Sequence, residues 1–248
     1  MISAGTVAAV GGIVFFSATL QRAVGFGFAL LAVPLMAFVV PTKSAVIIVF
    51  LDGALTSLWL CVRLRRKIVW STAGRLGIGA VLGAPVGVVI LRLVPGTTLR
   101  LILGITTCIA ALWIIATSRA GDSRPDVPRS STTFAMGLVS GVINTALATS
   151  GPPLVYELRR TGFRDDVFRA TISAVFVLSN LNGLPLLAAA GLVTRFDVTL
   201  AATSLAPCVA GIAAGSAVGA RMEPVHFAWA VDLLLLATGA LTIAKAIA

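Results

Sequence analysis

The sequence predicts an all-α integral membrane protein, a polytopic helical bundle of about 8–10 membrane segments built as two repeats. Three observations lead to this fold class. The 248 residues are 58% hydrophobic and only 11% charged, with a mean hydropathy of +1.04, which leaves too few charges to cover a soluble domain. Apolar runs of roughly 20 residues, the length of a membrane-spanning helix, recur from end to end. The two halves of the chain also match each other at a constant spacing.

The apolar segments are separated by short polar links, except near the middle of the chain. The only long polar connector is SRAGDSRPDVPRSS, Ser118–Ser131, which divides a first membrane repeat at residues 1–117 from a second at residues 132–248. The expected segments are Ser3–Leu20, Gly25–Val40, Ser44–Val62, Ala73–Leu91, Thr98–Thr117, Thr132–Ala148, Gly151–Leu158, Val167–Ala190, Asp197–Ala220 and Val225–Ile247.

Four segments of the second half repeat the first half at an offset of 126 residues (151 − 25), which places Gly25 on Gly151 and Ser44–Val62 on Ala170–Ala188. Rows of glycines at spacing four recur as well, and such rows let helices approach closely in lipid. The two rows are Gly79, Gly83 and Gly87 in the first half and Gly211, Gly215 and Gly219 in the second. The shared offset predicts an internal duplication.

The distribution of the 19 basic residues indicates how the second repeat lies. If each half opens with a helical hairpin, turning at Gln21–Val24 and at Thr149–Ser150, the second half is inverted and 14 of the 19 lie on the cytoplasmic side. If each opening crosses once as a broken helix, 10 lie inside and 8 outside. Lysine and arginine are retained in cytoplasmic links, so we expect the inverted arrangement. Gly151–Leu158 is only ~12 Å long, so we expect that arm to be re-entrant.

Composition also excludes several function classes. The net charge of +10 arises from short links such as Arg63 to Lys67, so it reflects membrane topology and no nucleic-acid partner is expected. His226 is the only histidine, and the three cysteines lie far apart. We therefore expect no enzyme, no metal site and no cofactor. The chain has no GxxxxGK[ST] loop, so it cannot hydrolyse ATP itself.

Two interruptions, GFGF at 25–28 and TSGPP at 149–153, lie inside otherwise apolar runs at matching positions of the two halves. Breaks inside a membrane are tolerated only where protein or water satisfies the freed backbone groups. Helices that begin near Gly25 and Gly151 would present N–H groups and a positive dipole end. Inverted repeats bring two such ends together near the midplane, which is how secondary transporters build an anion site.

Arg22 supplies a full positive charge at the first interruption, and polar side chains flank both. The alternative is that Arg22 is only a loop charge at a cytoplasmic turn and that the glycines serve packing alone. Thr145 is a further nearby donor. The candidate substrate-binding residues are Gln21, Arg22, Gly25, Phe26, Gly27, Asn144, Thr149, Ser150, Gly151 and Pro152.

Asp52 lies in the middle of an apolar segment, where carboxylates are costly and often carry protons. It is the candidate for proton coupling. The alternatives are a hydrogen bond between helices or an ion pair with Arg22. Glu157 and Asp232 are expected to balance nearby cations. The segment that matches Asp52 in the second half carries the neutral polar residues Ser179, Asn180 and Asn182.

The stretch QRAVGFGFALLAVPLM, followed by PTKSAV, resembles the first signature of the sulfite exporter TauE/SafE family, and GLVSGVINTALATSGPPLVYELRRTG resembles the second. The matching motif positions are Gln21, Gly25, Gly27 and Pro34, and then Gly137, Gly141, Gly151, Pro152 and Pro153. Many relatives have three successive glycines where this chain has Gly25-Phe26-Gly27-Phe28, and a second glycine in place of Ser150. This bulkier lining suits an organic anion better than bare sulfite.

The resemblance covers essentially the whole chain and implies a secondary membrane transporter of small anions, in the export direction. Sulfite, sulfonates or related sulfur-containing organic acids are the implied substrates, and protons are a candidate coupling ion. The implied location is the bacterial inner membrane, with the lipid bilayer as a partner. An anion channel and a permease for a non-sulfur organic acid are the alternatives, and an oligomer is compatible with the sequence.

Overall fold

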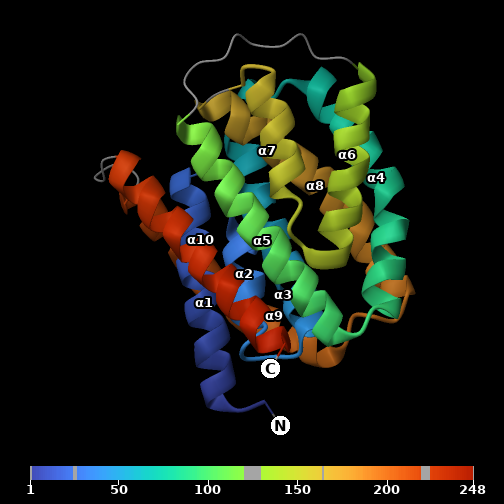
Figure 1. The fold of residues 1–248 in the computed structure, drawn as a ribbon, viewed down its shortest axis with the longest axis vertical. Helices are drawn as coiled ribbons and strands as arrows, with labels where there is room; N and C mark the ends of the chain where they lie inside the picture. Colours follow the sequence, from blue (N-terminus) through green and yellow to red (C-terminus); the bar gives the residue numbers. More distant parts are fainter. Residues whose placement is uncertain (1, 25–26, 120–129, 164, 219–223, 248) are drawn as a thin grey trace. The chain divides into compact units, whose positions relative to one another are not determined.

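The computed structural model describes residues 2–24, 27–119, 130–163, 165–218 and 224–247, and the regular structure in these ranges is helical throughout (Figure 1). This confirms the all-α prediction. The helices are α1 (Ala4–Val24), α2 (Phe28–Met36), α3 (Thr42–Arg63), α4 (Trp70–Leu93), α5 (Gly96–Arg119), α6 (Ser130–Leu147), α7 (Gly151–Arg160), α8 (Asp165–Ala189), α9 (Arg195–Val218) and α10 (Pro224–Ile247), with one 3-10 turn, η1 (Arg65–Lys67).

Helix lengths agree with a polytopic membrane protein. Among the described residues, six helices are long and apolar enough to cross a bilayer: α1, α3, α4, α5, α8 and α9. By contrast, α2 and α7 have only 9 and 10 residues. At 1.5 Å per residue they are about 14 and 15 Å long, roughly half of the ~30 Å hydrocarbon core. Each half of the chain therefore contains one short helix directly after a long one.

The helix starts repeat as the sequence offset predicts. Helices α1, α4 and α5 begin at Ala4, Trp70 and Gly96, and their counterparts α6, α9 and α10 begin at residues 130, 195 and 224. This correspondence supports the duplication. The boundaries of the two repeats, at 117 and 132, stay a prediction because residues 120–129 lie outside the described ranges.

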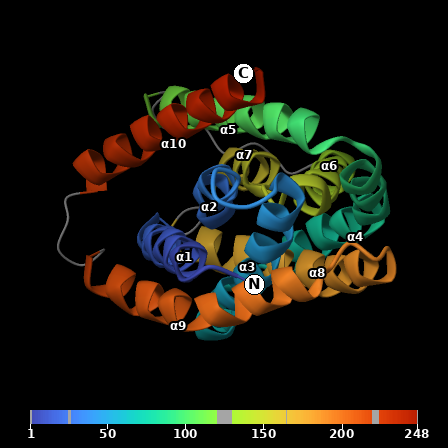
Figure 2. The ribbon, with the colours of Figure 1, turned by 90° about the horizontal axis from the view of Figure 1, so that it is seen from below.

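Contacts group the chain into two compact units, each of which draws on both halves of the sequence. Unit 1 comprises Met1–Asp52, Val94–Asp122 and Thr194–Ala248, and unit 2 comprises Gly53–Leu93 and Ser123–Val193. In unit 1, α1 packs on α9 and α5 packs on α10 (Figure 2). In unit 2, α4 packs on both α6 and α8. The pairing of α1 with α9 and of α4 with α6 is reciprocal, because α6 and α9 are the counterparts of α1 and α4.

Close contact through glycine holds the helix pair at the centre of unit 2. A Cβ atom on Gly83 would collide with the backbone carbonyl of Leu138, and one on Gly141 would collide with the backbone of Ala80. The neighbours of Gly79 and Gly87 lie at 134–138 and 142–146, so residue numbers rise together and the two helices run parallel. The predicted close approach of this glycine row is confirmed. Helix α8 also runs parallel to α4, because Gly77 meets Leu178 and the Asn182 amide donates to the Val81 carbonyl at 3.3 Å.

Unit 1 uses the second glycine row in the same way. Gly211 faces the backbone of Phe15, and Gly215 faces Thr19, so α9 runs parallel to α1. Gly219 of this row lies outside the described residues. Helices α5 and α10 run in opposite directions, since Gly104 meets Ile243 whereas the Cys108 thiol meets Gly239.

Gly83→Ala is expected to destabilise the protein by about 1–3 kcal/mol, because its new methyl group meets the α6 backbone, which cannot give way as a side chain could. The matched control is Gly74→Ala on the same helix, where nothing lies within 4 Å of the added Cβ. That change should be neutral or stabilising, since alanine favours helix over glycine. Thermal unfolding in detergent compares the two variants. Equal stability of the two would contradict the close contact.

Candidate functional site

The first interruption begins later than the sequence suggested. Helix α1 continues through Val24, so Gln21 and Arg22 lie in its last helical turn and not in a turn at 21–24. The reason is that no glycine or proline lies between Gly12 and Gly25, and a cation in the last turn is favourable to the helix dipole. Gly25 and Phe26 lie outside the described residues. Gly27 adopts φ 102° as the N-cap of α2, a left-handed conformation that favours glycine.

Two buried oxygen atoms on one face of α1 lack partners near this break. Among the described residues, neither Ser17 Oγ nor Gln21 Oε1 has a hydrogen-bond partner. The two residues are four apart on the helix, so their side chains lie on the same face. Gln21 was predicted as a site residue, but Ser17 was not. The signal that could have found Ser17 is its place one turn before Gln21 in an otherwise apolar segment.

Asp52 is fully buried on α3 and contacts α9. Its Oδ2 accepts a hydrogen bond from the Ser204 hydroxyl at 2.8 Å, whereas its Oδ1 has no partner among the described residues. Arg22 lies beside a different part of α9 from Asp52. Its Cβ is close to Gly215, which is 11 residues (215 − 204) beyond Ser204. Eleven residues rise by about 16 Å, farther than an arginine side chain reaches. The alternative of an Asp52–Arg22 ion pair is therefore wrong, and the helix-to-helix hydrogen bond is present.

The second interruption is described completely. Helix α6 ends at Leu147, α7 begins at Gly151, and residues 144–151 are all buried. Ala148 has φ 56°, the one positive value among the described non-glycine residues. Alanine in this left-handed conformation costs free energy, and such strain is most often found at functional sites.

Polar side chains from α6 and α8 surround this break. The Asn144 amide donates to Ser179 Oγ at 2.9 Å and to Asn180 Oδ1 at 3.3 Å. The Ser140 hydroxyl donates to the carbonyl of Ser150 at 3.3 Å. Thr149 Oγ1 is buried and has no partner among the described residues. This buried cluster includes three predicted site residues, and Ser140 is an addition that sequence reasoning missed.

The start of α7 offers fewer backbone donors than a helix start normally does. Pro152 and Pro153 occupy its first turn and carry no N–H, and Ser150 makes no side-chain capping bond. Of the first three helical residues, only Gly151 has an N–H group. The helix dipole still points its positive end at the break. Thr145 contributes little, because its hydroxyl donates to the Gly141 carbonyl at 2.9 Å.

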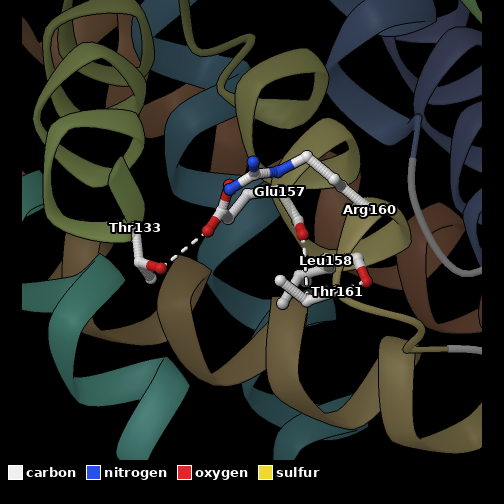
Figure 3. Close-up of polar contacts among 5 residues, drawn as sticks. All are labelled: Thr133, Glu157, Leu158, Arg160 and Thr161. Carbon is white, nitrogen blue, oxygen red and sulfur yellow. Dashed lines mark hydrogen bonds and ion pairs between the residues drawn. The ribbon is translucent and has the colours of Figure 1, made fainter. Parts of the chain in front are cut away.

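The other end of α7 is fixed to α6 by a buried carboxylate (Figure 3). Glu157 is fully buried, accepts a hydrogen bond from the Thr133 hydroxyl at 2.6 Å and pairs with Arg160 at 3.1 Å. The Thr161 hydroxyl donates to the carbonyl of Glu157 at 2.9 Å. The expectation that Glu157 balances a nearby cation is confirmed. The side chain of Asp232, for which the same was expected, lies outside the described residues.

Half-length helices that follow breaks, with buried polar groups beside the breaks, are typical of membrane transporters. The family model described as Sulfite exporter TauE/SafE matches residues 10–242, nearly the whole chain. The chain belongs to this family and is a polytopic membrane protein of a family of transporters. Comparison with curated proteins and with solved structures finds no match.

Glu157→Gln should destabilise the protein by about 3–5 kcal/mol, because it leaves Arg160 facing a neutral group in a buried site. The matched control is Asp166→Asn, which breaks an ion pair with Lys67 that is exposed on both sides. Exposed pairs contribute little, so that variant should melt close to the wild type. Thermal unfolding with intact chains measures both. A Glu157→Gln variant as stable as Asp166→Asn would show that the carboxylate does not hold α7.

Proposed function

We propose that this chain is a secondary transporter that exports small sulfur-containing anions, sulfite or a sulfonate, across the bacterial inner membrane. Family membership supports the substrate class. The observation that carries the proposal is the second break, where a strained backbone, a helix dipole and a buried hydroxyl with no described partner coincide. An anion that leaves water needs such groups to replace its hydration, and apolar walls cannot supply them.

The substrate is held at the second break by neutral donors and the positive end of α7. The donors are the unpartnered Thr149 hydroxyl, the Gly151 N–H and the hydroxyl of Ser179, which accepts from Asn144 and so keeps its own hydrogen to donate. No charged side chain belongs to this described cluster, which suits an anion of single charge. Pro152 lies in the first turn of α7, where its fixed φ favours the helical conformation. Ser150, which is buried at this break, stands where many relatives have a glycine. This bulkier lining favours an organic sulfonate over sulfite.

Arg22 and Gln21 form a separate candidate in unit 1. Arg22 is half-buried in the last turn of α1, one residue after the unpartnered Gln21 Oε1. A guanidinium can donate two parallel hydrogen bonds to a sulfur oxyanion, and an ammonium cannot. The same arginine also stabilises the C-terminal end of α1, so substrate affinity and protein stability have to be measured together.

At this separate site, Arg22→Ala should weaken anion binding roughly 10- to 100-fold, the loss expected for a charge-assisted hydrogen bond of about 1.5–3 kcal/mol, while binding at the second break persists. Arg22→Lys should lose less, since it keeps the charge and the contribution to the helix end. Calorimetric titration of the folded variants with sulfite and with methanesulfonate measures the affinities. If Arg22→Ala binds as the wild type does, the arginine serves only α1 and the topology.

The helix directions support an inverted second repeat. In that arrangement the counterparts α5 and α10 run oppositely, and α4 and α8 run the same way. If the two repeats instead had the same orientation, with each opening segment crossing the membrane once as a broken helix, α5 and α10 would run the same way and α4 and α8 would run in opposite directions. The antiparallel α5–α10 contact and the parallel α4–α8 contact therefore favour inversion. On this reading α2 and α7 are re-entrant arms, too short to cross the membrane alone.

Asp52 is the proposed proton carrier, because it is a fully buried carboxylate in the middle of the apolar helix α3, with one oxygen that has no described partner. Asp52→Asn keeps its size but cannot exchange a proton. It should abolish accumulation driven by a pH gradient while substrate binding persists. Flux into proteoliposomes, with saturation measured, tests this and also separates a carrier from a channel.

The control for that experiment is Asp197→Asn, a second fully buried carboxylate of unit 1. Asp197 caps α9 by accepting a hydrogen bond from the Thr194 N–H at 2.9 Å, a structural role that explains its burial. This variant should retain driven flux. Driven accumulation by Asp52→Asn at the wild-type rate would make Asp52 a structural residue.

A further inference from the structure

One end of unit 2 carries a dense group of exposed cations. The link between α3 and α4 presents Arg63, Arg65, Arg66 and Lys67 to solvent, and Arg75 follows on the first turns of α4, also exposed. The 3-10 turn η1 packs against α8, whose first turns carry Asp166 and Arg169. Residues 63–67 and Arg75 together form a positively charged surface, the basic face.

The link is held in a defined conformation and is not a loose tail. Ile68 is buried, and the Val69 N–H donates to Thr171 Oγ1 on α8 at 3.2 Å. Lys67 pairs with Asp166, which also ties the link to α8. Arg63 stacks on the ring of Trp59, with its guanidinium carbon 5.3 Å from the ring centre. The backbone that carries the remaining arginines of the link is therefore held in place by the fold.

Two described carboxylates of unit 2 are already engaged. Asp166 pairs with Lys67, and Glu157 is buried against Arg160. Among the described residues, no side chain pairs with Arg65, Arg66 or Arg75. Three cations of the basic face with no described partner create a positive potential that an external anion can neutralise.

The side chains next to the basic face place it at the boundary of the bilayer. Val62, just before the cations, is 57% exposed, and Ile78, one turn beyond Arg75, is 60% exposed. In a membrane protein such exposed apolar side chains face lipid. Trp70 is 60% exposed at the start of α4, and tryptophan is enriched where lipid headgroups meet the hydrocarbon. The exposed cations therefore lie at the height of the lipid phosphates.

We propose that the basic face binds the headgroup of an anionic phospholipid, with Arg65 and Arg66 on the phosphate and Trp70 against the glycerol and upper acyl chain. Clusters of four or more basic residues directly beside a membrane helix attract anionic lipid, by about 1 kcal/mol for each lysine or arginine. The contact is distinct from the substrate site, since none of these residues belongs to either break. Bound lipid would brace the α3–α4 link against α8.

The test compares lipid binding by the full chain with binding by Arg65→Gln/Arg66→Gln. The purified protein in neutral detergent is titrated with short-chain phosphatidylglycerol, with phosphatidylcholine and with inorganic phosphate, and native mass spectrometry counts bound lipid. The double variant should bind phosphatidylglycerol roughly 25-fold more weakly, about 5-fold for each arginine. The double variant keeps Arg63, Lys67 and Arg75, so the link still carries the positive charge that determines its side of the membrane.

The control is Arg92→Gln/Arg195→Gln, which removes the same charge from exposed residues outside the basic face. Control and wild type should bind phosphatidylglycerol equally and phosphatidylcholine weakly. Equal weakening in both double variants would show a nonspecific charge effect and overturn the proposal. Inorganic phosphate that competes at the same concentration as phosphatidylglycerol would indicate a free-anion site and also overturn it.

Discussion

A break in a membrane helix needs partners for the backbone groups that it frees, because lipid offers none. At the second break these partners come from neighbouring segments. Ser140 donates to the carbonyl of Ser150, and the Ala148 N–H donates to the carbonyl of Asn144 at 2.6 Å. Pro152 and Pro153 reduce the number of donors that need a partner. What remains unpaired is the hydroxyl of Thr149, and the proposed substrate takes the place of its missing partner.

The helices around the break must be held firmly if so few groups are to bind an ion. Close glycine contacts fix α6 on α4, and Asn144 connects α6 to α8. Glu157 then fixes the far end of α7 to the first turn of α6. The short helix is therefore supported at both ends by α6. The reciprocal pairing of α1 with α9 gives the first break a similar support in unit 1.

The fold could be predicted from sequence because its signals are local. Apolar length, glycine and proline positions and the repeat offset located the described α-helices and the second break. Interactions between distant residues could not be predicted in this way: Asp52 and Ser204 are 152 positions apart, and nothing in either segment indicates the other. For the same reason the two compact units, which mix helices from both halves, were not foreseen. The end of α1 was placed too early because Arg22 was interpreted as a turn residue, whereas a helix end accommodates it well.

Substrate protection of the second break tests the central claim most directly. In a chain with Cys61, Cys108 and Cys208 replaced, Ser150→Cys is treated with a water-soluble cationic thiol reagent, with and without methanesulfonate. Ser131→Cys, at the exposed polar start of α6, is the control. We predict that the sulfonate slows labelling at 150 in a saturable manner and leaves labelling at 131 unchanged. An unchanged rate at 150 at saturating substrate would contradict the claim that the anion is held at this break.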